Sequence, residues 1–167
     1  MSTLVGAVVG VGATVLADRS RWKRDQSRER DQLRRESYGG YLAAIIQAHE
    51  AMRAAATGDA DSPESKQTAI TEAFRSADPY VHRFELSLVA PAEVVTLAVA
   101  VFRRVREIRD LLISGASGQS AEYRAAQRAY YDAIKAMSDA MRQDLGNSPL
   151  GSETMGGPLL GTDDPVP

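Results

Sequence analysis

The side chains with most potential for chemistry in this sequence are two histidines and six tyrosines. Neither His49 nor His82 has a glutamate three residues before it, the Glu-x-x-His step used by metal sites in helical bundles. His49 lies on the apolar face of a helical pattern, so we expect a packed histidine with one hydrogen bond. The tyrosines fall mostly at core-facing steps, which predicts core packing, with an aromatic ligand cleft between helices as the alternative. We therefore expect no metal site and no cofactor site.

Other constellations that support catalysis are missing from the pattern. The chain has no cysteine, which excludes disulfides, thiolate metal ligands and cysteine nucleophiles. Serines are plentiful, but no serine stands in a context that indicates a Ser/His/Asp set. No glycine-rich loop follows a convincing strand, as a phosphate-cradling loop requires. The sequence accordingly predicts no catalytic residues and a protein that is not an enzyme.

Composition favours a single helical domain. At 167 residues the chain is long enough for one domain with a core. Its hydrophobic fraction is 44%, much of it alanine, and aromatic residues make up only 6%, a mixture typical of packed amphipathic helices. The formal net charge of −2 gives the whole chain no bias towards nucleic acid, and we expect no nucleic-acid partner.

The first segment of the chain is apolar and the next is densely charged. Leu4–Ala17 carries no charge, whereas Asp18–Glu36 holds eight basic residues against five acidic ones. The apolar run is short for a membrane span, which needs about 20 residues. No charged side chain precedes it, however, and the arginine-rich cluster follows at once. We therefore predict a single-pass membrane anchor at residues 1–17, with the amino terminus outside and the rest of the chain in the cytoplasm.

Two other interpretations of the apolar segment stay open. It could be a cleaved signal peptide, although the basic n-region of such peptides is missing. It could also pack within a soluble protein, including a homo-oligomer. Gly6 and Gly10 have the small-residue spacing of transmembrane helix dimers, which marks them as candidate helix-contact residues.

Residues 18–37 are polar around the whole circumference of a helix, which is typical of a solvated stalk. Opposite charges three or four residues apart support such a helix in isolation. Its first turns stand next to the predicted anchor, where basic and aromatic side chains meet anionic lipid headgroups. The candidate headgroup-contact residues are Arg19, Arg21, Trp22, Lys23 and Arg24.

From residue 38 onwards the apolar residues recur at helical spacing up to residue 146. The first helix has Gly39-Gly40 as a candidate bend and Gly58 as a candidate left-handed residue at its end. Ser62-Pro63 reads as the start of a second helix, which Pro79 should kink or interrupt.

Two further helices follow, one restarting at Ala90–Glu93 and ending near Gly115, the other running from Ala121 to Gly146. Short loops join them, so we predict an all-α fold with an antiparallel three- to four-helix bundle at residues 38–146. Asn147–Pro167 is rich in glycine and proline without periodicity, which predicts a disordered tail.

Three short motifs give the chain a resemblance to a known group. They are an Arg-x-x-x-Tyr step leading into the bundle at Tyr38, a Leu-x-Ala-Pro-x-Glu-Val turn beginning at Leu88, and an Arg-x-Asp-Leu-Gly ending at Gly146. With the apolar segment, these motifs resemble uncharacterised actinobacterial proteins that are short, helical and membrane-anchored by a single pass. The resemblance covers roughly residues 4–146 and implies architecture and localisation, but no site.

Together these observations predict a membrane-tethered helical bundle that binds an unknown protein partner as scaffold, sensor or regulator, and also contacts membrane lipid. Two alternatives remain. One is a soluble, homo-oligomeric interaction module whose first helix packs in the oligomer. The other is an enzyme or small-ligand binder with a site between the helices near His49 and the tyrosines.

Overall fold

The computed structural model describes the backbone of residues 3–149 and the side chains of Trp22 and residues 25–149. Within that part of the chain every regular element is a helix, which confirms the all-α prediction. The helices are α1 (Thr3–Thr57), α2 (Pro63–Ser76), α3 (Pro79–Val89), α4 (Ala92–Ile113) and α5 (Ala121–Asp144).

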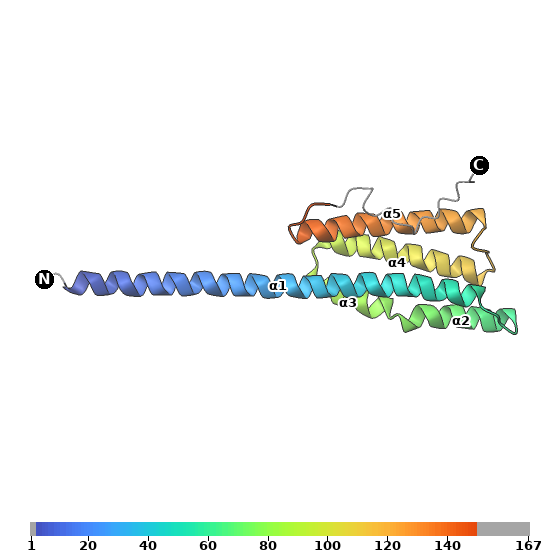
Figure 1. Ribbon diagram of the computed structural model, residues 1–167, viewed down its shortest axis with the longest axis horizontal. Coiled ribbons are helices and arrows are strands. Elements are labelled where there is room, and N and C mark those ends of the chain that lie inside the picture. The colour runs from blue at the N-terminus through green and yellow to red at the C-terminus, as the bar shows by residue number, and fades with distance from the viewer. Residues whose placement is uncertain (1–2, 150–167) are drawn as a thin grey trace, which may run out of the picture.

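The helices form an antiparallel bundle in which α2 and α3 together act as one interrupted helix (Figure 1). Helix α1 packs against α2, α3 and α4, and α5 packs mainly against α4. Successive bundle helices run in alternating directions, because the loops between them are short. The predicted three- to four-helix bundle is thus confirmed, with α2 and α3 in the second position.

Helix α1 is much longer than the other helices. It runs through 55 residues, which corresponds to about 80 Å at the usual rise of an α-helix. Its second half lies in the bundle and its first half projects from it as a rod (Figure 1). The helix also continues through Gly39-Gly40, so no break occurs at the predicted bend. A Cβ atom at Gly40 would lie 3.4 Å from the His82 ring, and glycine therefore lets α3 lie close to α1.

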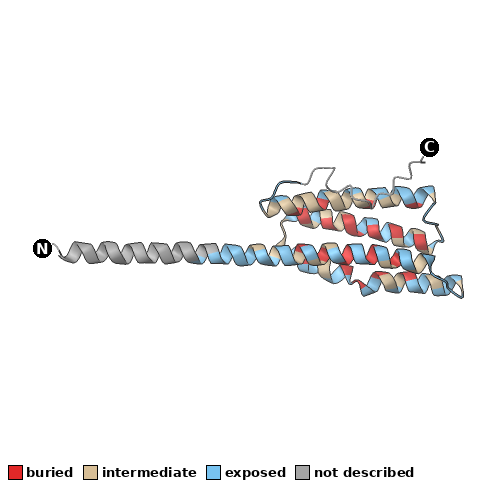
Figure 2. Ribbon diagram, viewed as in Figure 1, coloured by how far each residue is buried: buried red, intermediate tan, exposed pale blue. Residues whose placement is uncertain are grey.

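Buried side chains form a single core inside the bundle (Figure 2). They repeat at three- and four-residue steps, as the sequence pattern predicts for helices that bury one face. Full burial of a large aliphatic side chain stabilises a fold by about 1.5–3 kcal/mol. The largest fully buried aliphatic residues and methionines are Ile45, Met52, Ile70, Leu86, Ile108 and Met137.

Local sequence determines where α2 begins and where α3 separates from it. The Ser62 hydroxyl accepts a hydrogen bond from the Ser65 amide, and Pro63 occupies the first turn, as predicted. Asp78 adopts a left-handed conformation with φ of 48°, and α3 restarts at Pro79, which has no amide hydrogen to donate. The predicted interruption at Pro79 is confirmed.

One predicted helix end is wrong in its geometry. Helix α1 stops at Thr57 as expected, but Gly58 does not have a positive φ angle. Instead its amide donates to the carbonyl of Ala54 at 2.9 Å, which continues the helical hydrogen-bond pattern for one more residue. Among the described glycines the left-handed region is occupied by Gly115, with φ of 89°, and by Gly146, with φ of 75°.

The predicted disordered tail lies mostly outside the described residues. The structure describes only Asn147, Ser148 and Pro149 of it. There the Asn147 amide donates to the carbonyl of Arg142, and the Arg142 guanidinium donates to the carbonyl of Ser148 at 2.8 Å. Through these contacts the first residues of the segment close the end of α5.

Candidate functional site

His49 belongs to α1, and its side chain faces α5, where the ring contacts two tyrosines. Its ring centroid is 4.7 Å from that of Tyr130 and 6.1 Å from that of Tyr131. The His49 side chain is only 1% exposed, and Tyr130 is equally buried. We call His49, Tyr130 and Tyr131 the His49 cluster. The prediction that His49 packs in the core is confirmed.

Burial controls the protonation of His49. Burial lowers its pKa, and the Glu50 carboxylate, with an oxygen 3.3 Å from Nδ1, opposes that shift only in part. The neutral ring can donate one hydrogen bond, and Glu50 is the acceptor that lies within reach of Nδ1. The other ring nitrogen, Nε2, has no hydrogen-bond partner among the described residues. His49 thus makes the single hydrogen bond that its position predicted.

Other tyrosines join α1 to the helices opposite it. The Tyr41 hydroxyl donates to the carbonyl of Ala98 in α4 at 2.7 Å, and the Tyr130 hydroxyl donates to the carbonyl of Ile45 at 3.4 Å. Burial raises the pKa of both phenols above the usual value of about 10. Both therefore stay protonated and act as hydrogen-bond donors in the core. Tyr80, in contrast, is 51% exposed, so the core prediction fails there.

A hydrogen-bonded cluster closes the bundle where α1 joins it. The Tyr38 hydroxyl donates to Asp144 Oδ2 at 2.6 Å, and Arg34 Nη1 lies 3.4 Å from Asp144 Oδ1. The Arg34 Nε donates to the carbonyl of Val89 at 3.2 Å. We call Arg34, Tyr38, Val89 and Asp144 the neck cluster. It holds the last turns of α3 and α5 against α1, and both Asp144 carboxylate oxygens have partners in it.

The three short motifs of the sequence meet in the neck cluster. Arg34 and Tyr38 form the Arg-x-x-x-Tyr step, Val89 stands in the Leu-x-Ala-Pro-x-Glu-Val turn, and Asp144 belongs to the Arg-x-Asp-Leu-Gly ending. Residues up to 110 positions apart in the chain are in contact there. The residues of these motifs therefore have a structural role, because they close the bundle at its neck.

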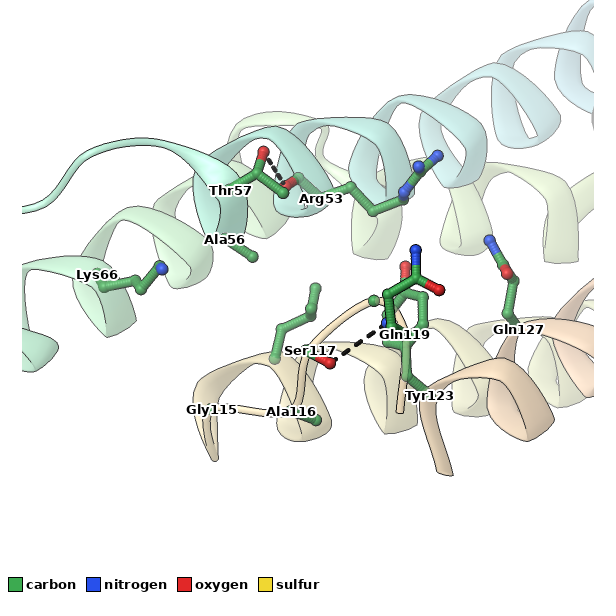
Figure 3. Close-up of a pocket in the computed structure, with 12 residues that line it drawn as sticks. Arg53, Ala56, Thr57, Lys66, Gly115, Ala116, Ser117, Gln119, Tyr123 and Gln127 are labelled. Atoms are coloured by element: carbon green, nitrogen blue, oxygen red, sulfur yellow. Dashed lines mark hydrogen bonds between the residues drawn. The ribbon is translucent and has the colours of Figure 1, made fainter. Parts of the chain in front are cut away.

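The opposite end of the bundle carries a pocket of about 480 Å³, a volume that suits a small organic ligand. It lies between the last turns of α1, the start of α2 and the loop that joins α4 to α5 (Figure 3). We call it the distal pocket. None of the described residues that line it is acidic, and two are basic. The side chains that line it include Arg53, Ala56, Lys66, Leu112, Gln119, Tyr123 and Gln127.

Tyr123, which lines this pocket, has a buried hydroxyl that is closed off from the open space of the pocket. The residue is only 2% exposed, and its hydroxyl has no partner within the described part of the chain. Burial raises its pKa, the positive charge of Arg53 opposes the shift, and the nearby Tyr131 and Glu50 add to it. Figure 3 shows the side chain extending from α5 towards α1. A buried hydroxyl without a partner costs about 1–3 kcal/mol, so this position is unfavourable for stability alone.

An apolar ridge runs along the outer side of α3. Val81, Phe84 and Leu88 are 52%, 68% and 72% exposed, whereas Leu86 of the same short helix is fully buried. Their spacing of three and four residues places them on one side of the helix, opposite the buried side. We call these three residues the α3 ridge. Exposed apolar groups at such spacing are typical of a surface that binds another helix.

The predicted membrane-associated residues are mostly beyond the described side chains. Gly6 and Gly10 lie within the range of α1, but no side-chain contacts are described before Trp22, which is 74% exposed. The side chains of Arg19, Arg21, Lys23 and Arg24 are outside the described set as well. Over the residues that can be assessed, no helix is long and apolar enough to cross a membrane. The anchor and the headgroup contacts therefore stay predictions.

His82 does not join His49 in any site. It lies on α3 beside Gly40, and its Nδ1 is 3.1 Å from Glu85 Oε2. Within the described residues no group of three or more histidine, aspartate or glutamate side chains could hold a metal ion.

The distal pocket was not predicted from the sequence. Arg53 falls on a polar face, and Lys66 looks like an ordinary basic residue in a first turn. The segment from Ala116 to Ser120 shows only that a loop is present. The periodicity of α5 predicts Tyr123 as a core residue, but nothing in the sequence marks its hydroxyl as one without a partner.

Comparisons with protein-family models, with curated proteins and with solved structures found no match to this chain.

Proposed function

We propose that this chain is a non-enzymatic, membrane-tethered helical bundle that acts by binding another protein. The tether is the apolar segment Leu4–Ala17, and the arginines that follow it keep the bundle on the cytoplasmic side. Arg19, Arg21, Trp22, Lys23 and Arg24 contact lipid headgroups. The group that the chain resembles has the same organisation.

The observation that carries the protein-binding part is the α3 ridge. Its three large apolar side chains remain in solvent although the same helix buries Leu86. Left uncovered, they forfeit a large part of the stabilisation that burial of apolar side chains provides. The spacing matches the anchors of a helix that packs against another helix, and the occupant is accordingly an amphipathic helix of a partner protein.

Continuity of α1 supports the tethered arrangement. One helix spans both the apolar segment and the bundle, without a break at the stalk. Residues 18–33 extend about 24 Å as a helix, so the stalk holds the bundle clear of the bilayer surface. The α3 ridge is then accessible to a protein partner and out of reach of lipid.

Alkaline extraction of membranes tests the tether. The full chain is expected to stay with the membrane pellet, and a chain that lacks residues 1–17 is expected to be released as a folded protein. Full-length protein that is entirely soluble without detergent would refute the tether. If the deletion also dissociates a stable oligomer into monomers, the homo-oligomeric alternative is favoured.

Site-specific photocrosslinking in cells tests the ridge. Crosslinkers at positions 84 and 88 are expected to give a discrete adduct with a second protein, whereas a crosslinker at position 46 is expected to give none. Ile46 is a matched control because it is 49% exposed on α1. Phe84→Glu should abolish the adduct formed from position 88, and Ile46→Glu should leave it intact. An adduct of two copies of the chain would indicate self-association instead.

A further inference from the structure

The distal pocket has the charge of an anion-binding site. Arg53 and Lys66 line it from α1 and α2, and its described lining has no carboxylate. Arg53 Nη1 contacts Glu50 at 3.3 Å, but the Lys66 ammonium group has no partner among the described residues. The lining thus brings two cations, of which Arg53 is paired with a carboxylate outside the lining, and this charge favours an anionic ligand.

The α4–α5 loop adds donors on the opposite side of the pocket. The backbone amides of Ser117 and Gly118 make no hydrogen bond within the described part of the chain. Ser120 then caps α5, whose Tyr123 amide donates to the Ser120 hydroxyl at 3.2 Å. The amino-terminal end of this 24-residue helix carries a partial positive charge, part of which the Glu122 carboxylate in its first turn offsets.

Tyr123 supplies an independent indication of a ligand. Its hydroxyl is closed to solvent and lacks a partner, so it has no hydrogen bond to lose when a ligand arrives. A ligand oxygen that reaches it after a shift of the lining side chains gains a full hydrogen bond. Anionic oxygens are the strongest acceptors for such a phenol.

The remaining lining is suited to a small organic group. Ala56, Leu112 and Ala116 provide apolar surface, while Gln119 and Gln127 provide amides. The volume of about 480 Å³ exceeds what an inorganic anion fills. A phosphate group carries about −1.5 to −2 charges at neutral pH, which matches Arg53 and Lys66.

We infer that the distal pocket binds a small phosphomonoester, with Arg53, Lys66 and the Tyr123 hydroxyl on the phosphate and the organic group against Ala56, Leu112 and Ala116. The pocket lies at the end of α1 opposite its amino terminus (Figures 1 and 3). A soluble compound is therefore the source of the phosphate, and a lipid headgroup is the competing source. The choice of a soluble source rests on the proposed membrane tether at the amino terminus, whereas the phosphate site itself does not depend on the proposed protein partner.

Titration of the purified full chain with phenyl phosphate, followed by ³¹P NMR, tests the inference. Saturable binding is expected for phenyl phosphate, with much weaker binding of inorganic phosphate and no displacement of phenyl phosphate by benzyl alcohol. Arg53→Gln, Lys66→Gln and Tyr123→Phe should each weaken binding at least about tenfold. Arg103→Gln, which removes an exposed charge that does not line the pocket, should leave the affinity unchanged.

Circular dichroism of each variant checks that the fold is intact, and Arg53 and Lys66 are not core residues. Failure of phenyl phosphate to saturate would overturn the inference. So would equal affinity in the wild type and the Arg53→Gln variant. Binding to vesicles that contain phosphatidic acid, without binding of phenyl phosphate, would overturn the soluble source and hence the proposal.

Discussion

The two ends of the interface between α1 and α5 differ in whether their buried polar groups have hydrogen-bond partners. At the neck, the Tyr38 hydroxyl, the Arg34 guanidinium and the Asp144 carboxylate satisfy one another. At the distal end, the Tyr123 hydroxyl is equally buried but has no described partner, and a pocket opens beside it. The same side-chain type thus stabilises one end and leaves hydrogen-bonding capacity unused at the other. The neck is therefore assigned to stability, and the distal end is where we propose that a ligand binds.

Fully buried residues lie midway between the two ends of the interface. Substitution of one of them has the largest expected effect on the free energy of unfolding. Tyr130→Ala removes a fully buried ring that contacts His49, together with a hydroxyl that donates a hydrogen bond to the carbonyl of Ile45. We expect the free energy of unfolding to fall by about 3–5 kcal/mol, as measured by urea unfolding. Leu88→Ala, at an exposed position, should change it by less than about 0.5 kcal/mol. Similar losses of stability in both variants would contradict the view that the buried middle of the interface holds the bundle together.

The neck should respond to the loss of its common acceptor. Asp144→Ala leaves the Tyr38 hydroxyl without its partner and removes the carboxylate from Arg34. A loss of about 1–3 kcal/mol is expected in urea unfolding. Asp132→Ala is the matched control, since Asp132 is an exposed aspartate of α5. If both variants unfold at the same urea concentration, the neck cluster contributes nothing to stability.

Acid should weaken the bundle through His49. Burial lowers the pKa of His49 in the folded protein, with Arg53 acting in the same direction and Glu50 against it. In the unfolded chain the pKa returns to about 6.5, so only the unfolded state gains a proton as the pH falls below that value. Stability should therefore drop from pH 7.5 to 5. The drop should shrink in His49→Gln and persist in His82→Gln. If the drop in stability is unchanged in His49→Gln, a group other than His49 causes it.

Much of the fold could be predicted from local sequence. Ser62 with Pro63 predicts the start of α2, and Pro79 predicts its separation from α3, because capping and the missing amide act within a few residues. Periodicity likewise predicts which face of each helix is buried. Gly58 failed as a left-handed residue because its amide could continue the helical hydrogen bonds, a choice that composition does not reveal.

The site could not be predicted in the same way. The neck motifs were visible in the sequence, but their contact depends on how α1, α3 and α5 pack together. The distal pocket depends on the path of a glycine- and serine-rich loop, which sequence marks only as a loop. Tyr80 was expected in the core, yet it is half exposed, since the periodicity of α3 is apolar on both sides.

A matched pair of substitutions tests the contrast between the two ends most directly. Tyr38→Phe and Tyr123→Phe each delete one buried hydroxyl and keep the ring. Urea unfolding at neutral pH should show a loss of about 1–2 kcal/mol for Tyr38→Phe, which breaks the bond to Asp144. Tyr123→Phe should leave stability unchanged or raise it by up to about 1 kcal/mol, because no hydrogen bond is lost. A loss in Tyr123→Phe equal to that in Tyr38→Phe would contradict the account.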